Sequence, residues 1–263
     1  MKKDIAIALL PLLLSCSASR RLSIVTYNVG AFNKSHYSSI EEIASMMKEV
    51  KADVISLNEV DSCTVRTGKV DQIKEFASEL GGWDYTYAKA IDHQGGGYGI
   101  GIVSAPGYKP VVSGHFILDK GEGKEYRACA VNEYENFILL TTHLENKVPA
   151  VRLQQIKAVC QWVEDHYKDA DKPIFLCGDM NSAPDSAVLS YLKKNWTVLS
   201  PADYTMPSWE PRKCIDYILV YNNAAAATVK VKVARVIKKF KTGNVAKTSD
   251  HLPVLVKVSI PKK

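Results

Sequence analysis

The sequence lacks several features that would assign it to common classes of protein. Its six cysteines form no Cys-x-x-Cys pair and no cluster with histidine at zinc-ligand spacing, which excludes a zinc-binding module. Its apolar runs are shorter than the about 20 residues that cross a bilayer as a helix. No Gly-Lys-Ser or Gly-Lys-Thr follows the glycine-rich run 95–101, which favours a hairpin loop over a phosphate-binding loop. No linker or repeat interrupts residues 22–260, so one domain is predicted.

What is present fits a globular protein with one core. The chain has 263 residues, of which 46% are hydrophobic and 24% charged, and this balance excludes a disordered or fibrous protein. The net charge of +6 is a mild excess that favours anionic partners without indicating a polybasic binder. Much of the excess lies in residues 230–247, where basic and apolar residues alternate as on the solvated face of a strand, which we prefer to a nucleic-acid patch.

The first residues of the chain resemble a targeting segment. Lys2 and Lys3 precede an apolar run that ends in Leu-Leu-Ser-Cys16, and this pattern is similar to a bacterial lipoprotein signal. The resemblance implies a signal peptide over residues 1–15, a lipid on the thiol of Cys16 and a tether over residues 16–21. The alternative is an ordinary secretory signal that is cleaved nearby. In both cases the sequence predicts export, and the lipoprotein signal predicts anchoring in a bacterial cell envelope.

Residue patterns along the rest of the chain predict many strands and a few helices. Alternating or continuous apolar runs predict strands over 22–29, 53–57, 85–90, 98–104, 111–118, 127–133, 137–143, 174–177, 215–220, 229–236 and 253–260. Amphipathic patterns predict helices after Ser39 and Asp71 and over 148–167 and 186–194. Two blocks of strands that each carry helices predict an α/β fold: a four-layered α/β sandwich, with two mostly antiparallel sheets face to face and helices outside.

Two of these helices begin with capping signals. Ser39 and Glu42 have the spacing of a capping box, in which the two side chains bond to each other's backbone N–H groups. Asp71 stands at the start of the second helix, where an aspartate commonly accepts a hydrogen bond from the first turn. Both side chains are therefore expected to cap.

Polar side chains recur where the predicted strands end or begin. Loops at strand ends present side chains at one edge of a packed scaffold, so these residues are expected to gather there. The group comprises Asn28, Asn58, Glu59, His143, Asp179, Asn181, Asp216, Asp250 and His251. Carboxylates and amides supply an oxygen-rich metal site, and the histidines supply acid and base groups, which together suit phosphoryl transfer.

These residues stand in ordered motifs that resemble the endonuclease/exonuclease/phosphatase superfamily, whose members include deoxyribonuclease I-like enzymes. The motifs are Thr-Tyr-Asn28, Asn58-Glu59-Val, Thr-Thr-His143-Leu, Gly-Asp179-Met-Asn181, Ile-Asp216-Tyr-Ile and Ser-Asp250-His251-Leu-Pro. The resemblance covers residues 22–260 and is nearest to small, exported bacterial members. It implies a catalytic domain over 22–263 that cleaves phosphate esters with a divalent metal.

The resemblance also assigns metal ligands. Glu59, Asn28 and Asp250 would hold Mg²⁺, or Mn²⁺ as the alternative, through oxygen atoms. Asp179 would orient and deprotonate the attacking water, and Asn181 would hold that water or a phosphoryl oxygen.

Two histidines complete the implied catalytic set. His251 would donate hydrogen bonds to the phosphate, and Asp216 would fix its tautomer through the other ring nitrogen. His143 would lie opposite, as a phosphate ligand or as the proton donor to the leaving oxygen. Arg127 is a candidate phosphate clamp, because a guanidinium fork matches phosphate oxygens, and a structural ion pair is its alternative role.

Three further positions affect the expected site. Asn58 stands where glutamine is common in the superfamily, so this shorter amide is expected to loosen a contact to Glu59 and weaken metal binding. Met180 stands where phenylalanine is common and removes no catalytic function. Trp209, in the loop before Asp216, either borders the substrate cleft or packs on its rim.

The sequence therefore predicts an exported, monomeric phosphodiesterase, nuclease or phosphatase with a lipid anchor. Its substrate would be a phosphate ester of nucleic acid, a phospholipid headgroup, or a sugar or inositol phosphate. The alternative is a non-catalytic surface protein that binds a phosphorylated ligand on the same scaffold. That alternative is disfavoured because Glu59, Asp179, Asn181 and His251 are all present.

Overall fold

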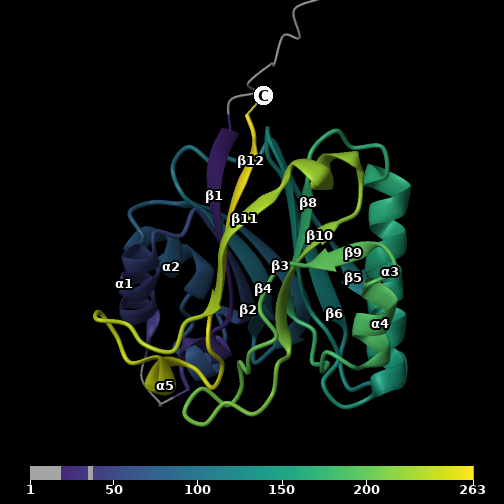
Figure 1. Ribbon diagram of the computed structural model, residues 1–263. Helices are drawn as coiled ribbons and strands as arrows, with labels where there is room; N and C mark the ends of the chain where they lie inside the picture. Colours follow the sequence, from purple (N-terminus) through teal and green to yellow (C-terminus); the bar gives the residue numbers. More distant parts are fainter. Residues whose placement is uncertain (1–18, 35–37, 263) are drawn as a thin grey trace, which may run out of the picture.

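The computed structural model describes residues 19–34 and 38–262 (Figure 1). The predicted signal segment and Cys16 lie outside these residues. The strands are β1 (Ser19–Asn28), β2 (Val54–Ser62), β3 (Asp84–His93), β4 (Gly96–Ser104), β5 (Val112–Leu118), β6 (Arg127–Glu133), β7 (Ile138–His143), β8 (Ile174–Asp179), β9 (Trp196–Val198), β10 (Asp216–Tyr221), β11 (Lys230–Val236) and β12 (Val254–Pro261). The α-helices are α1 (Ile40–Val50), α2 (Gln72–Glu79), α3 (Pro149–Tyr167), α4 (Ala187–Leu192) and α5 (Val245–Thr248).

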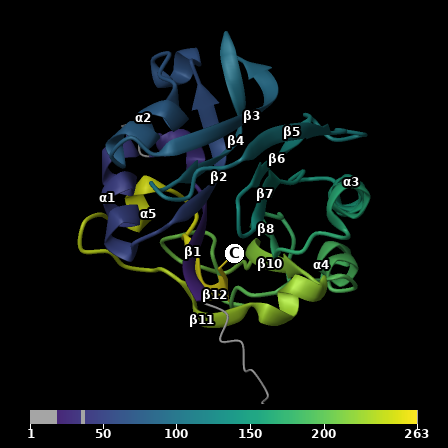
Figure 2. The same cartoon turned by 90° about the horizontal axis from the view of Figure 1, so that it is seen from above.

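The strands form two sheets of six strands each. The first has the order β11-β12-β1-β2-β4-β3, and the second has the order β5-β6-β7-β8-β10-β9. Helices α1 and α2 lie outside the first sheet and α3 and α4 outside the second, as Figure 2 shows from above. Within residues 19–34 and 38–262, only β1 with β2 and β7 with β8 pair in parallel. The predicted four-layered sandwich is therefore confirmed.

Each parallel pair is joined by a helix outside its sheet, α1 between β1 and β2 and α3 between β7 and β8. A parallel connection requires such a crossover, and it brings the carboxyl ends of both strands to the same edge. In Figure 1 these four strand ends lie at the lower end of the sandwich, opposite the chain's C-terminus. Residues that follow the four strands therefore meet at one place.

Apolar side chains of the second sheet alternate between its two faces, so both faces are packed. Leu139, Phe175 and Ile218 belong to the core between the sheets. Their neighbours Leu140, Leu176 and Leu219 pack in the cluster that includes apolar residues of α3 and α4. Side chains of a strand point alternately to opposite faces, so nearly continuous apolar strands are required where both faces are covered.

The structure differs from the sequence-based expectations at several element ends. Strand β1 begins at Ser19, within the predicted tether, because its first residues pair with the end of β12. The short elements β9 and α5 were not predicted, since three or four residues are too few to show a periodic pattern. Among the described residues, no helix is long and apolar enough to cross a membrane.

The two predicted side-chain caps are wrong. Ser39 precedes α1 but makes no capping bond, and its hydroxyl instead donates to the carbonyl of Thr248. Glu42 accepts from the backbone N–H of Asn244 at 2.6 Å. Asp71 also makes no side-chain cap at α2. Contacts with the distant α5 segment replace the local capping box at α1, and a sequence pattern does not reveal such contacts.

Candidate active site

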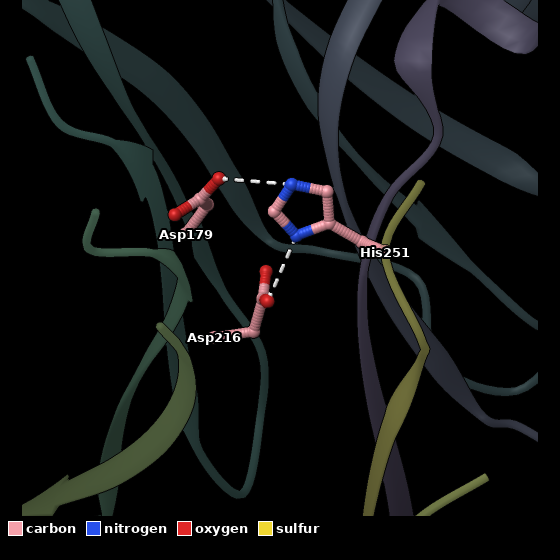
Figure 3. A group of neighbouring side chains, drawn as sticks. All are labelled: Asp179, Asp216 and His251. Atoms are coloured by element: carbon pink, nitrogen blue, oxygen red, sulfur yellow. Dashed lines mark hydrogen bonds and ion pairs between the residues drawn. The ribbon is translucent and has the colours of Figure 1, made fainter. Parts of the chain in front are cut away.

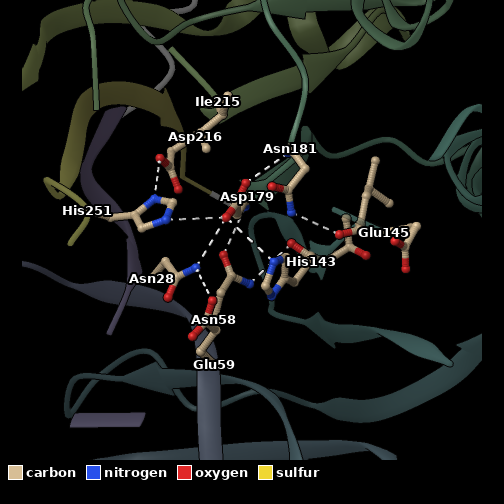
Figure 4. A network of polar contacts seen from close by, with 12 residues as sticks. Asn28, Asn58, Glu59, His143, Glu145, Asp179, Asn181, Ile215, Asp216 and His251 are labelled. Carbon is tan, nitrogen blue, oxygen red and sulfur yellow. Dashed lines mark hydrogen bonds and ion pairs between the residues drawn. The ribbon is translucent and has the colours of Figure 1, made fainter. Parts of the chain in front are cut away.

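The polar residues predicted from the strand ends meet at one end of the sandwich, the lower end in Figure 1. Asn28 ends β1, His143 ends β7 and Asp179 ends β8. Asp216 begins β10 and lies opposite Asp179 in the antiparallel register. His251 comes from the segment before β12. Figure 4 shows these side chains converging from both sheets.

Glu59 is directed into this group by an irregularity in β2. Its φ is +56°, and the pairing of β2 with β4 shifts register between Asn58 and Val60. A β-bulge of this kind changes the direction of a side chain, and a positive φ in a residue other than glycine is a strained conformation that often occurs at functional sites. The carboxylate of Glu59 lies 3.0 Å from the amide nitrogen of Asn28 and remains partly exposed.

Asp179 lies at the centre of the network. Its Oδ2 accepts from Asn28 Nδ2 at 3.1 Å, and its Oδ1 accepts from the backbone N–H of Asn181 at 2.8 Å. The Nε2 atoms of His143 and His251 lie 3.5 and 3.7 Å from Asp179 Oδ2. Burial raises the pKa of Asp179 to about 7, and the Asp216 carboxylate adds to the rise. A carboxyl group with this pKa is suited to accept a proton near neutral pH.

Asn58 holds Asp179 rather than Glu59, which corrects the sequence-based expectation. Its Oδ1 accepts from the backbone N–H of Asp179 at 2.9 Å, and its Nδ2 donates to the carbonyl of Thr142 at 3.1 Å. The side chain is fully buried. Asn58 thus connects β2 of the first sheet to β7 and β8 of the second, and its amide fixes the backbone that carries Asp179.

Gly178 permits the close pairing of β7 and β8 beside Asp179. Its φ is +135°, and a Cβ atom at this position would lie 1.9 Å from the carbonyl oxygen of Thr142. Gly178→Ala is therefore expected to lower the free energy of unfolding by about 3 kcal/mol, measured by denaturant unfolding. Gly114→Ala in β5, where a Cβ meets nothing within 4 Å, should change it by less than about 0.5 kcal/mol. Equal effects of the two substitutions would refute this role.

Asp216 and His251 form a buried pair beside Asp179, shown in Figure 3. His251 Nδ1 lies 2.9 Å from Asp216 Oδ2, so the ring is oriented with Nε2 toward Asp179. Burial alone would lower the pKa of His251, but the carboxylates of Asp216 and Asp179 outweigh burial and raise that pKa to about 10. The imidazole is thus positively charged at neutral pH and offers an N–H donor to an anion.

The charge on His251 gives a prediction for Asp216→Asn. Because the folded-state pKa of His251 lies above its ordinary value, the stability it contributes is complete below about pH 6.5 and is lost as the pH rises toward 10. The Asp216 carboxylate is the main cause that raises the pKa of His251, so its loss should make the ring release its proton at a lower pH than in the wild type. NMR titration of the His251 ring in chelator-treated protein measures this, with Asp185→Asn, an exposed aspartate, as control. An unchanged titration would contradict the pairing.

His143 lies on the other side of Asp179 and is neutral. Burial lowers its pKa well below the ordinary 6.5, and the positive charges of Arg127 and His251 act in the same direction. Arg127 Nη1 lies 3.5 Å from His143 Nδ1. Because arginine only donates hydrogen bonds, this contact assigns the lone pair to Nδ1 and the proton to Nε2, which faces Asp179.

Arg127 is buried beside His143 and makes an ion pair with Glu125 at 3.2 Å. Its Nε has no hydrogen-bond partner within the described part of the chain. The ion pair was one of the two roles considered for this residue. The role of phosphate clamp stays a prediction.

Asn181 and Asp250 occupy the border of the network. Asn181 has a φ of +47° and donates from Nδ2 to the carbonyl of Leu144 at 3.0 Å, which fixes its side chain next to Asp179. Asp250 makes an ion pair with Lys34 at 3.0 Å. A role of Asp250 as a metal ligand beside Glu59 stays a prediction.

Two residues near the site were not found from the sequence. Lys34 pairs with Asp250 across more than 200 positions, and no local pattern links the two. Glu145 is buried with its Oε2 lacking a hydrogen-bond partner in the segments described. Its position two residues after His143 was the one available signal, because it extends the Thr-His-Leu motif.

The donor atoms fit a divalent cation. Carboxylate oxygens of Glu59 and Asp179 lie 3.0 and 3.1 Å from the amide nitrogen of Asn28, so both acids lie beside one amide group, and the Oδ1 of that amide accepts from the backbone N–H of Gly30. Hard oxygen ligands of this kind are what Mg²⁺ and Mn²⁺ bind. Asp179, Asp216 and His251 form a second cluster with suitable atoms within 4.8 Å of one another. There His251 Nδ1 is already bonded to Asp216, which favours the Glu59 side for a metal.

The chain was compared with known proteins. A model of the Endonuclease/Exonuclease/phosphatase family matches residues 25–251. A comparison with curated protein sequences finds no match.

Solved structures share the fold at low sequence identity. A mannosyl-6-phosphatase of Bacteroides thetaiotaomicron is 18% identical, with 90% of this chain and 99% of that chain covered and a TM-score of 0.73. An endonuclease/exonuclease/phosphatase of Bacteroides vulgatus is 17% identical, with 92% and 99% covered and a TM-score of 0.75. The catalytic domain of human Nocturnin, solved with a bound sulfate anion, is 19% identical, with 93% and 97% covered and a TM-score of 0.70.

Proposed function

The chain belongs to the Endonuclease/Exonuclease/phosphatase family, and we propose that it is a divalent-metal-dependent hydrolase of phosphate esters. One observation carries this proposal. The carboxylate of Asp179 is contacted at once by Asn28, which also contacts Glu59, and by two imidazoles, one charged and one neutral. A base, an acidic metal-binding group and N–H donors are thus held at one point.

Glu59 would hold the cation, with Asp250 and the Oδ1 of Asn28 as further ligands, because the Nδ2 of Asn28 is a hydrogen-bond donor and does not bind a cation. The ion supplies positive charge that neutralises a phosphoryl oxygen during displacement. Asn28 and Asn58 fix the positions of the two carboxylates before substrate arrives. Phosphoryl transfer depends mainly on such positioning and on stabilisation of charge.

Asp179 accepts the proton from the attacking water in this proposal. Its raised pKa makes the carboxylate a stronger base than an exposed aspartate, and the Asn181 N–H holds Oδ1 in place. Asn181 would hold that water or a phosphoryl oxygen, and Arg127 would clamp the phosphate. The attacking oxygen forms a bond to phosphorus while the bond to the leaving oxygen breaks.

The two histidines would bind the phosphate from opposite sides. Both Nε2 atoms face the same oxygen of Asp179, so an anion that enters there meets two N–H donors. The charged His251 stabilises negative charge on the phosphoryl group, and Asp216 keeps its ring oriented. The neutral His143 is placed to bind the phosphate through its Nε2–H. Because its pKa is lowered, it carries no acidic proton near neutral pH, so the charged His251 would be the group that protonates the leaving oxygen.

A substrate panel tests this function. Protein without residues 1–15 is assayed on single-stranded and duplex DNA, RNA, sphingomyelin, inositol phosphates and sugar phosphates, first with Mg²⁺ or Mn²⁺ and then with a chelator. We expect at least one ester to be hydrolysed, the chelator to abolish hydrolysis and added metal to restore it. Activity that survives complete metal removal would contradict the proposal, as would a failure on every ester.

We further propose that the protein is an exported monomer attached to a bacterial membrane through a lipid on Cys16. Strand β1 begins at Ser19 and ends at Asn28 in the site, nine residues later. At about 3.3 Å per residue, β1 spans about 30 Å, so the site lies at the end of this strand that is farther along the chain from the predicted attachment point. This placement favours substrates in solution over headgroups of the anchoring membrane. Mass spectrometry of the N-terminal peptide and size-exclusion chromatography test the lipid and the monomer.

A further inference from the structure

A cavity lies beside the His251 segment and has no part in the chemistry proposed above. It has a volume of about 440 Å³ and lies between the loop that carries Trp209 and the segment of residues 238–246. Its lining combines two aromatic side chains, Trp209 and Phe240, with two cations, Lys238 and Lys239. Pockets of about 300 to 1,000 Å³ accommodate small ligands, so this cavity is large enough for a single ring compound.

The Trp209 side of the cavity is bonded directly to the catalytic segment. The backbone N–H of Ser208 donates to the carbonyl of Asp250 at 2.8 Å, and the Ser208 hydroxyl donates to the carbonyl of Ser249 at 2.6 Å. Ser249 in turn accepts from the backbone N–H of His251. Trp209 therefore directly follows Ser208, which is hydrogen-bonded to the segment that carries His251.

The opposite side of the cavity is hydrogen-bonded to side chains of helix α1. Glu49 Oε2 accepts from the backbone N–H groups of Lys241 and Thr242 and from the Thr242 hydroxyl, at 2.9 to 3.0 Å. Glu42 accepts from the backbone N–H of Asn244. Both walls are thus fixed by hydrogen bonds, so a ligand would enter a cavity whose shape already exists. Figure 1 shows α5, which forms part of this wall, at the same end of the sandwich as the site.

The exposed groups in this cavity indicate what it binds. Trp209 is 64% exposed, an unusual state for the largest aromatic side chain. Lys238 and Lys239 are exposed, and within the described part of the chain neither makes an ion pair. An aromatic face stacks on a flat ring, and unpaired ammonium groups attract an anion. The combination fits one ligand that carries both a ring and a negative charge.

We propose that this cavity binds the part of the substrate beyond the phosphate that is cleaved, namely a sugar or nucleobase ring whose compound carries a second phosphate. The proposal rests on the function proposed above and narrows it to small bisphosphorylated ring compounds. The ring stacks on Trp209, the second phosphate is held by Lys238 and Lys239, and the first phosphate lies at Asp179 and His251. Trp209 is then a specificity-determining residue rather than a catalytic one.

The kinetic test compares substrates that differ only in what the cavity would bind. Adenosine 3′,5′-bisphosphate tests for a nucleobase ring, and fructose 1,6-bisphosphate tests for a sugar ring. Each bisphosphate is compared with the corresponding monophosphate, which lacks the phosphate that the cavity would bind. For the preferred bisphosphate, Trp209→Ala and the double variant Lys238→Ala/Lys239→Ala should raise KM by about tenfold with kcat nearly unchanged. The double variant should leave KM for the monophosphate unchanged, and Trp209→Phe should restore most of the affinity lost in Trp209→Ala.

Matched control variants and a binding measurement distinguish a failure of the cavity proposal from a failure of the proposed function. Tyr204→Ala removes another exposed aromatic residue of the same loop, and Lys230→Ala/Lys232→Ala removes exposed lysines of β11. None of these residues lines the cavity. In chelator-treated protein, either bisphosphate should shift the NMR signal of the Trp209 indole N–H saturably. A saturable shift with no hydrolysis of any ester would contradict the proposed hydrolase function but would support binding of a bisphosphate in the cavity. Turnover with KM unchanged in both cavity variants would overturn the cavity proposal.

Discussion

Asp179→Asn is expected to lower kcat for phosphate ester hydrolysis by about 1,000-fold, a typical size for the loss of a general base. Asparagine has nearly the same shape, so its Oδ1 still accepts from the Asn181 N–H, but its amide has no basic lone pair for the proton of water. The buried carboxylate of Asp179, with its raised pKa, is the group best placed to take that proton. Initial rates at saturating substrate and metal measure the effect.

Asp185→Asn is the matched control for this substitution. Asp185 lies six residues further along the chain and is exposed, so the same chemical change there removes no contact within the network. Thermal unfolding of both variants establishes that folding is retained. If Asp179→Asn folded normally and kept more than about one tenth of the wild-type kcat, Asp179 would not be the base.

Glu59→Gln is expected to weaken the binding of Mg²⁺ and Mn²⁺ by about 100-fold, because even residues that merely orient metal ligands contribute 10-fold to 100-fold. Glutamine keeps one oxygen but loses the negative charge that a hard cation requires. A ligand that binds only the folded state raises its stability. The increase in melting temperature that millimolar metal produces in the wild-type protein should therefore disappear in Glu59→Gln, and hydrolysis should fall with it.

Glu41→Gln provides the control for metal binding. Glu41 is an exposed glutamate on α1, and its loss changes the net charge by the same amount. Isothermal titration of each variant with Mn²⁺ gives the affinity directly. Equal affinities in the wild type and Glu59→Gln would place the metal elsewhere, and the cluster of Asp179, Asp216 and His251 would be the next candidate.

The fold and most of the site could be predicted from the sequence because both depend on local patterns. The apolar strands that end in Asn28, His143 and Asp179 show where each strand stops, and loops at strand ends present side chains at one edge of a scaffold. The convergence of these side chains was predicted on that ground, whereas the parallel pairing of β1 with β2 and of β7 with β8 was not. Glu59 was also identified, although its bulge and positive φ were not, since a register shift depends on the partner strand.

Contacts between distant segments could not be predicted in the same way. Asn58 was expected to support Glu59, its neighbour in the sequence, yet it bonds to backbone atoms of β7 and β8 in the other sheet. Glu42 was expected to cap its own helix, yet it holds the backbone of Asn244. In each case a polar side chain bonds to a backbone group that the packing of the sheets and loops brings close. Composition and periodicity do not predict that packing.

The most direct test of the account is to follow the oxygen atom of the attacking water. The preferred ester is hydrolysed by the wild-type protein with Mg²⁺ in water enriched in oxygen-18, and both products are analysed by mass spectrometry. If water activated by Asp179 attacks phosphorus, the heavy oxygen must appear in the phosphate product and be absent from the released alcohol. Heavy oxygen in the alcohol, with none in the phosphate, would contradict the proposed chemistry.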